Sequence, residues 1–231
     1  FGVLSDGRLG RDALHEAAGT GLWIGRPVEV PGSHPVELEI GPDFGSALVE
    51  WPVDHVAKVL TFYHPDDDPA SRREEETLLT RLFAACRANG LELLVELIPS
   101  RSGPVADETT AAIMARMYDI GIRPDWWKLE PMHSDDAWAA CCDTIRKQDP
   151  WCRGIVVLGL DAPEDMLAQS FAKAARHPLV KGFAIGRTIF AEAARQWLTG
   201  AIDDTTAVDK MVGNYQRLCT LWDKARGEED A

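Results

Sequence analysis

The stretch PDWWKLEP, residues 124–131, is an apolar run with a proline at each end and a lysine near its middle. Its large aromatic residues favour a buried strand, and proline, which cannot donate to a central hydrogen-bond ladder, marks the ends of one. An ammonium group without a partner is costly to bury, so a buried amine tends to lose its proton and become a nucleophile. We therefore expect Lys128 to be a reactive amine.

Strand-like and helix-like segments alternate on both sides of this stretch. The hydrophobic patterns and the Gly and Pro punctuation predict strands over residues 1–5, 21–29, 53–63, 91–98, 124–131, 154–160 and 182–190. They predict helices over residues 9–18, 71–89, 107–120, 134–147, 163–176, 192–198 and 203–224. Strands separated by helices pair in parallel, and repeats of roughly 30 residues indicate an α/β fold of the TIM (β/α)8 barrel type.

A closed barrel of this type has eight strands, whereas seven can be recognised in this sequence. The simplest interpretation is that the chain, which begins at Phe1 without a methionine, lacks the first βα unit and is the C-terminal part of a longer protein. The alternative is that the irregular stretch 36–49 contains a strand. We expect a single barrel domain over residues 1–231, with an acidic tail at 226–231.

Three charged residues interrupt predicted strands that should be apolar throughout, because both faces of a strand are buried in a parallel barrel. Lys58, Glu96 and Lys128 lie in three successive predicted strands, separated by roughly 30 to 40 residues, the length of one βα unit. The three side chains should therefore meet inside the barrel, near the C-terminal ends of the strands, where barrel enzymes keep their active sites.

Strand alternation predicts the direction of each side chain around Lys128. Successive residues of a strand point to opposite faces. Trp126, Lys128 and Glu130 should point into the barrel, and Trp127 and Leu129 should pack outward on the helices.

A Lys-Glu-Lys set can form and break a Schiff base. Burial and repulsion by Lys58 should lower the pKa of Lys128, giving a neutral amine that condenses with a ketone. Glu96 can shuttle protons, and Lys58 can polarise or protonate the oxygen. The structural alternative is a buried salt bridge that satisfies only itself, but three charges at one level of a barrel exceed what such a pair needs.

The last two predicted strands carry the residues of an anion site. Gly159 lies near the end of one strand and Gly186 and Arg187 lie in the other, where many barrels bind phosphate with backbone N–H groups and a helix N-terminus. The alternative is a tight strand end with a surface arginine. Arg26, a cation inside an apolar run, is a further candidate contact for a substrate carboxylate or phosphate.

Two more residues are candidates for contact with substrate. Glu130 should point the same way as Lys128, and His64, which alternates in step with Lys58, should stand at the barrel mouth, although a histidine at the start of a loop is commonly just solvated. No histidine has the spacing of metal ligands. We therefore predict no catalytic metal and no cofactor.

The composition limits the kind of partner. A formal net charge of −13 repels nucleic acid and anionic membranes, and no apolar run approaches the ~20 residues of a membrane span. Five cysteines, an odd number without metal-type spacing, favour reduced thiols in the cytoplasm. The expected partner is a phosphorylated small molecule.

The segments VAKVLTFYHPDDD, LLVELIP, PDWWKLEP, IVVLGLDAP and GFAIGRTIF, in this order, resemble the C-terminal domain of bifunctional 5-dehydro-2-deoxygluconokinase/5-dehydro-2-deoxyphosphogluconate aldolase. SDGRLGRDAL and WIGRPVEVPGS extend the resemblance over nearly the whole chain. More distantly, the strand ends are similar to class I tagatose-bisphosphate aldolase. The family's earlier strand with an Ala-Phe-Asp-type motif has no match in this sequence, in keeping with a missing first βα unit.

The resemblance implies a class I, metal-independent aldolase in which Lys128 forms the Schiff base, Glu96 is the acid/base and Lys58 assists. The implied reaction cleaves 2-deoxy-5-keto-D-gluconate 6-phosphate to dihydroxyacetone phosphate and malonate semialdehyde, in inositol catabolism. An alternative of another class is a non-catalytic barrel that binds a sugar phosphate and regulates an attached sugar kinase. A kinase domain in the same natural chain and a homo-oligomer both stay open at this point.

Overall fold

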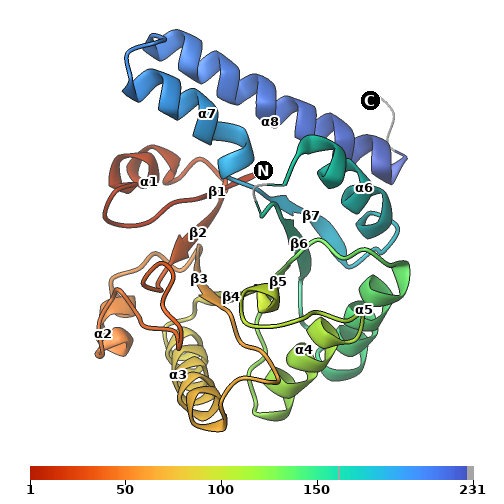
Figure 1. Cartoon of the computed structure of the whole chain (residues 1–231). Coiled ribbons are helices and arrows are strands. Elements are labelled where there is room, and N and C mark those ends of the chain that lie inside the picture. Colours follow the sequence, from red (N-terminus) through yellow and green to blue (C-terminus); the bar gives the residue numbers. More distant parts are fainter. Residues whose placement is uncertain (161, 228–231) are drawn as a thin grey trace.

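Seven parallel strands lie side by side in chain order, and helices surround them (Figure 1). The computed structural model describes residues 1–160 and 162–227. The strands are β1 Gly2–Leu4, β2 Trp23–Pro27, β3 His55–Thr61, β4 Glu92–Leu97, β5 Trp126–Leu129, β6 Gly154–Leu158 and β7 Val180–Ala184. The helices are α1 Arg11–Ala17, α2 Phe44–Val49, α3 Pro69–Ala88, α4 Thr109–Asp119, α5 Asp135–Gln148, α6 Glu164–Ala174, α7 Arg187–Leu198 and α8 Asp204–Arg226, with a short 3-10 helix at Pro99–Arg101. The alternation confirms the TIM-barrel architecture expected from the sequence.

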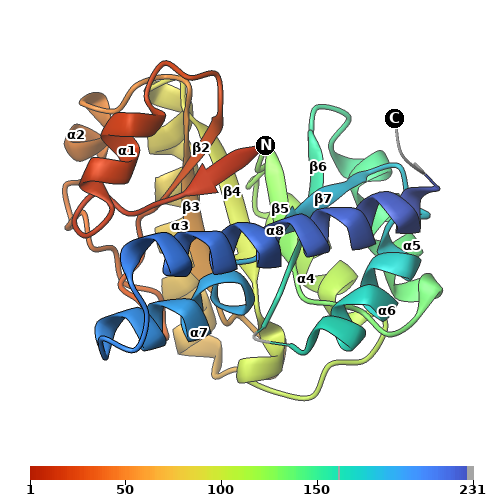
Figure 2. The same cartoon turned by 90° about the horizontal axis from the view of Figure 1, so that it is seen from above.

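The barrel is nearly closed, and α8 covers the side where its sheet ends. Within the described residues, β1 and β7 are the edge strands. The Tyr215 ring of α8 contacts both the Phe1 ring beside β1 and the Phe183 ring of β7, with centroids 6.2 and 6.3 Å apart. Figures 1 and 2 show α7 and α8 side by side over these edges.

The stretch 36–49 does not contain a strand, so that alternative is wrong. Residues Phe44–Val49 form α2, and the stretch contributes one isolated bridge between Glu29 and Leu38. Phe44 and Leu48 of α2 are buried in the main hydrophobic core. Seven strands are therefore what the described part of the chain supplies.

The last strand is shorter than the predicted 182–190, which is a correction with consequences for the site. Strand β7 ends at Ala184, and α7 begins at Arg187, where the Ile189 N–H donates to the Gly186 carbonyl at 2.8 Å. The β-branched and aromatic residues of this stretch favour a strand locally, but as a helix they pack along α8. The correction places a helix N-terminus directly after β7.

Helix α3 illustrates how local sequence sets an element. The Asp68 carboxylate accepts hydrogen bonds from the backbone N–H groups of Ala70 and Ser71, at 2.9 and 3.1 Å, and Pro69 occupies the first turn. Gly90, with φ at 68°, follows the helix end. These are the expected caps of a helix, and they set where α3 begins and ends.

The main core lies between the strands and the surrounding helices. Trp127 of β5 is buried there, and its indole N–H donates to the Tyr118 hydroxyl of α4 at 2.9 Å. Among the described residues, no helix combines the length and the apolar character needed to cross a bilayer. Helix α8 runs to Arg226, and residues 228–231 of the predicted acidic tail lie outside the described residues.

Candidate active site

Lys58, Glu96 and Lys128 meet inside the barrel. Lys128 Nζ lies 2.9 Å from Glu96 Oε1, and Lys58 Nζ lies 2.6 Å from Glu96 Oε2. The register explains the contact, because Glu96 and Lys128 are direct partners in the β4–β5 ladder and point to the same face. The side chains of Glu96 and Lys128 are only 5 and 11% exposed. Three strands therefore bring three charges into one desolvated cluster.

Strand β5 has the alternation expected from its sequence. Trp127 and Leu129 face outward into the main core. On the other face, the Trp126 ring packs edge-on against Trp23 of β2, with centroids 6.1 Å apart, and its N–H donates to Glu92 at 2.8 Å. Lys128 follows Trp126 on this inner face. The two tryptophans fill the barrel below the charged cluster.

The cluster separates the pKa values of the two lysines. Burial lowers the pKa of Lys128 below its usual value, and although Glu96 opposes this, the Lys58 charge lowers it further. Burial would also lower the pKa of Lys58, but Glu96 and Glu29 outweigh it, so that this pKa is raised. Burial would raise the pKa of Glu96, yet the two lysines hold it below its usual value. Lys128 is thus the lysine that loses its proton more readily.

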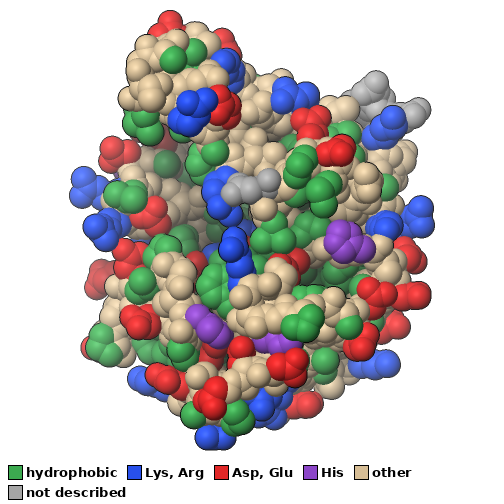
Figure 3. Space-filling view, viewed as in Figure 1, with side chains coloured by type: hydrophobic (Ala, Val, Ile, Leu, Met, Phe, Trp, Pro, Cys, Tyr) green, Lys and Arg blue, Asp and Glu red, His purple; other side chains and the backbone are tan. Residues whose placement is uncertain are grey.

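A cavity of about 270 Å³ opens above the cluster. Its wall contains Lys58, Glu96 and Lys128. The wall also contains residues from the end of β6 and from the segment that leads into α7, namely Leu158, Gly159, Leu160, Ile185, Gly186, Arg187, Thr188 and Phe190. Figure 3 shows Lys and Arg side chains at the middle of this face, over the barrel. The amine and a cationic helix start therefore share one cavity, despite the net negative charge of the chain.

The α7 N-terminus is suited to an anion. Gly186 is its N-cap, and Arg187 and Thr188 form its first turn beside the cavity. The N–H groups of a first helical turn have no partner within the helix and carry a partial positive charge. The Thr188 Oγ1 is buried and has no hydrogen-bond partner within the described residues. A phosphate could accept from these donors and from Arg187.

A family model described as an uncharacterized protein conserved in bacteria, DUF2090, matches residues 1–226. The chain belongs to the DUF2090 family. A search of curated proteins finds no match to its sequence. The barrel of this DUF2090 member is similar to those of solved aldolase structures, which supports the barrel fold independently of any motif.

Two fructose-bisphosphate aldolases illustrate the likeness. The enzyme from Plasmodium falciparum, solved in complex with TRAP and a small-molecule inhibitor, superposes with a TM-score of 0.65 at 16% identity, over 96% of this chain and 73% of that one. The enzyme from Slackia heliotrinireducens superposes with a TM-score of 0.57 at 16% identity, over 92% of this chain and 73% of the other. The DUF2090 member thus has an aldolase-like fold.

Gly159 and Gly186 of the DUF2090 member lie in the cavity wall, as their predicted role requires. A Cβ at Gly159 would come within 3.0 Å of the Ile185 side chain, and one at Gly186 within 3.1 Å of Phe190. Both neighbours also line the cavity. Gly159 therefore lets the end of β6 lie close to Ile185 after β7, and Gly186 leaves room for the Phe190 ring of α7.

Arg26 is the clearest correction among the predicted site residues. The β2–β3 register pairs Arg26 with Ala57, which faces the helices, and pairs Pro27 with Lys58, which faces the barrel interior. The Arg26 guanidinium lies over the Trp51 ring, 3.8 Å from its centroid. Stacking on this aromatic face keeps Arg26 outside the cavity of the DUF2090 member.

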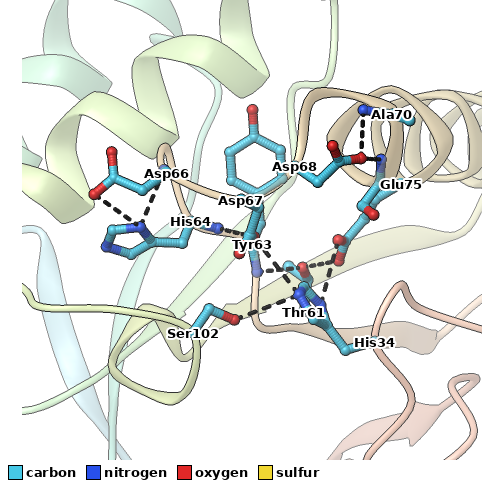
Figure 4. A network of polar contacts seen from close by, with 11 residues as sticks. His34, Thr61, Tyr63, His64, Asp66, Asp67, Asp68, Ala70, Glu75 and Ser102 are labelled. Carbon is cyan, nitrogen blue, oxygen red and sulfur yellow. Dashed lines mark hydrogen bonds and ion pairs between the residues drawn. The ribbon is translucent and has the colours of Figure 1, made fainter.

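His64 is neither solvated nor in the cavity wall. It is 2% exposed, and its Nε2 lies 3.0 Å from the Pro104 carbonyl while its Nδ1 accepts from the Asp66 N–H at 3.1 Å. Figure 4 shows its backbone N–H donating to Asp67, in a network that also contains Glu75. His64 therefore holds the loops after β3 and β4 together instead of pointing to a ligand.

Glu130 also has a structural partner. It is buried, and the Ser100 hydroxyl and backbone N–H both donate to its carboxylate, the latter at 3.2 Å. Burial raises the pKa of Glu130, although the Ser100 contacts oppose the shift. Glu130 does not line the cavity in the described residues, so its predicted contact with substrate is replaced by a bond to the turn after β4.

Sequence reasoning missed Thr188 and Glu29. Thr188 lies within the strand predicted over residues 182–190, so the sequence pattern does not indicate that it begins a helix. Glu29 alternates in step with Gly25 and Pro27, on the face that carries Lys58, while Arg26 alternates with the apolar residues Ile24 and Val28. That alternation was the available signal for Glu29.

Proposed function

We propose that this protein is a class I aldolase that cleaves a phosphorylated keto compound through a Schiff base on Lys128. The observation that carries the proposal is the contact of a desolvated lysine with a carboxylate, 2.9 Å apart, inside a cavity that also contains a helix N-terminus. The aldolase names of the two structural neighbours support the same reaction class.

The cluster can supply each proton that the reaction moves. Lys128 passes its ammonium proton to the Glu96 carboxylate, and the resulting neutral amine attacks the ketone carbon. Glu96 returns this proton to the carbinolamine hydroxyl, which departs as water and leaves an iminium ion. Glu96, now a carboxylate, takes the proton of the hydroxyl on the β carbon. The electron pair of the bond between the α and β carbons moves to the iminium, which yields an aldehyde and an enamine. Protonation of the enamine and addition of water release the ketone product and restore Lys128.

Lys58 and the α7 start have different tasks in this proposal. Lys58, held as an ammonium ion, donates to oxygen as the carbinolamine forms and breaks down. Arg187, Thr188 and the α7 backbone hold the phosphate, which positions the ketone carbon at Lys128 Nζ. No step assigned to these residues requires a metal ion.

The proposed substrate is 2-deoxy-5-keto-D-gluconate 6-phosphate, and its support is the sequence resemblance. In this compound the ketone lies next to the phosphate-bearing carbon, so cleavage gives dihydroxyacetone phosphate and malonate semialdehyde. The same resemblance is the basis for proposing a role in inositol catabolism and a kinase domain in the natural chain.

Reduction with borohydride in the presence of dihydroxyacetone phosphate tests the Schiff base directly. We expect a stable adduct on the peptide that contains Lys128, no adduct in Lys128→Met, and an unchanged adduct in Lys147→Met, whose lysine lies exposed on α5. The variant lacking Lys128 should also lose cleavage of the keto sugar acid. If dihydroxyacetone phosphate binds but leaves no adduct on Lys128, the protein is a non-catalytic sugar-phosphate-binding domain instead.

A further inference from the structure

Four ionisable side chains, not three, form an unbroken series that runs from the segment after β2 across β3 and β4 to β5. Glu29 Oε1 lies 2.5 Å from Lys58 Nζ, which lies 2.6 Å from Glu96 Oε2, and Glu96 Oε1 lies 2.9 Å from Lys128 Nζ. Glu29 is the outermost member and follows β2. Every member has a side chain that is 11% exposed or less. Charges at this depth interact strongly with one another, because little water screens them.

The backbone holds Glu29 in place from both sides. The Val28 N–H donates to the Lys58 carbonyl at 2.9 Å, and the Val30 N–H donates to the Glu37 carbonyl at 2.8 Å. Between these two bonds, Glu29 forms the isolated bridge with Leu38. The carboxylate is therefore delivered to Lys58 by a fixed segment and not by a mobile loop.

A structural ion pair with Lys58 does not require Glu29. Lys58 is already paired with Glu96, so a second buried carboxylate adds a desolvation penalty. Moreover, Glu29 Oε2 is buried and has no hydrogen-bond partner within the described residues. A buried carboxylate oxygen without a donor costs stability, which calls for another reason to keep the residue.

The series is asymmetric, and Glu29 makes it so. Without Glu29, Glu96 would stand between two lysines with one carboxylate oxygen for each, and either amine could be the neutral one. With Glu29, Lys58 has two carboxylate partners and Lys128 has one. The pKa directions agree with this, since that of Lys58 is raised and that of Lys128 is lowered. Arg187, which also lines the cavity, belongs to α7 and not to this series.

We propose that Glu29 is a positioning residue that determines which of the two buried lysines reacts: it holds Lys58 as the ammonium ion and leaves Lys128 as the neutral amine. This inference rests on the proposed Schiff-base function, and it adds the residue that directs the reaction to one amine. Glu29 acts through Lys58 and does not itself touch the substrate.

The test is the distribution of the borohydride-trapped dihydroxyacetone phosphate adduct between Lys58 and Lys128, measured by peptide mass mapping across pH. In wild type we expect the adduct on Lys128. In Glu29→Gln, which keeps the shape and removes the charge, the ratio of Lys58 to Lys128 adduct should rise at least about tenfold, the equivalent of one pKa unit. Glu29→Asp should restore the wild-type preference in part. Glu39→Gln, a surface change in the same segment, should leave the ratio unchanged.

A second measurement on wild-type protein needs no variant of Glu29. Nitrogen NMR of isotope-labelled lysine side chains, assigned with Lys58→Met and Lys128→Met, should show Lys128 Nζ losing its proton at lower pH than Lys58 Nζ. An unchanged adduct ratio in Glu29→Gln, or an earlier titration of Lys58, would overturn the inference. Absence of any adduct in wild type would instead refute the Schiff-base function, so the two failures are distinguishable.

Discussion

Glu96 contacts Lys128 and Lys58 with its two different oxygens, at 2.9 and 2.6 Å, so one carboxylate is shared by the amine proposed to react and by the lysine proposed to assist it. In the proposed reaction, this sharing would let Glu96 pass a proton to either amine without moving. It also means that any change at Glu96 alters both lysines.

Replacing Glu96 by Gln should remove the proton shuttle while keeping its size. We expect kcat to fall by about 100- to 10,000-fold, the range typical of a lost general acid/base, in a steady-state assay of keto sugar acid cleavage. Glu92→Gln is a matched control, because Glu92 lies on the same strand and accepts from Trp126 at the other end of the barrel. Equal losses in the two variants would mean that the effect is structural.

Arg187 and Arg26 should differ sharply in their effect on substrate binding. Arg187 lines the cavity, so Arg187→Met should raise KM by about 10- to 100-fold, as expected for a lost charge-assisted hydrogen bond to phosphate. Arg26 lies over Trp51 on the outer face, so Arg26→Met should leave KM near the wild-type value. A comparable rise in both variants would contradict the placement of the phosphate at α7.

Glu75 should make the protein less stable as the pH rises. It is 1% exposed and lies next to the His34 ring (Figure 4). Burial raises the pKa of Glu75, although the hydrogen bond from Thr61 and the nearby His34 oppose the shift, and Asp67 adds to it. A raised folded-state pKa means that the folded protein binds this proton more tightly than the unfolded chain. Its contribution to stability is therefore complete below the unfolded value of 4.5 and is lost as the pH rises through the folded value.

Urea unfolding at several pH values checks this expectation. Glu75→Gln should remove the decrease in the free energy of unfolding above pH 4.5. That decrease is worth about 1.4 kcal/mol for each unit by which the pKa of Glu75 is raised. Glu76→Gln should change the pH dependence of the free energy of unfolding in the opposite direction. The hydrogen bond from Arg116 lowers the pKa of Glu76, so the stabilisation that Glu76 provides is lost as the pH falls. Parallel stability curves for wild type and Glu75→Gln would show that Glu75 carries no such linkage.

Much of the site follows from strand alternation alone. Lys58, Glu96 and Lys128 are each a charge in an otherwise apolar strand, and the barrel expected from the alternation of strands and helices predicts that the three charges share its inner face. The same alternation predicts that Trp126 and Trp127 point to opposite faces of β5. The structure places Trp127 against Tyr118 in the outer core.

Other features depend on contacts between distant segments. Residues 187–190 have the composition of a strand, but in the structure they form the first turn of α7, which packs along α8 and provides the proposed anion site. Strand alternation predicts that His64 and Glu130 point toward the cavity. In the structure, both instead contact the segment after β4, and a local sequence pattern cannot reveal such contacts.

The sequence by itself determined the barrel and the three charges at its centre, because strand and helix periods are properties of neighbouring residues. Only the tertiary structure decided that Glu29 meets Lys58 and that Arg26 stacks on Trp51. The reason is physical: the face on which a strand residue lies is a local property, but the partner that it meets there depends on the register of the next strand.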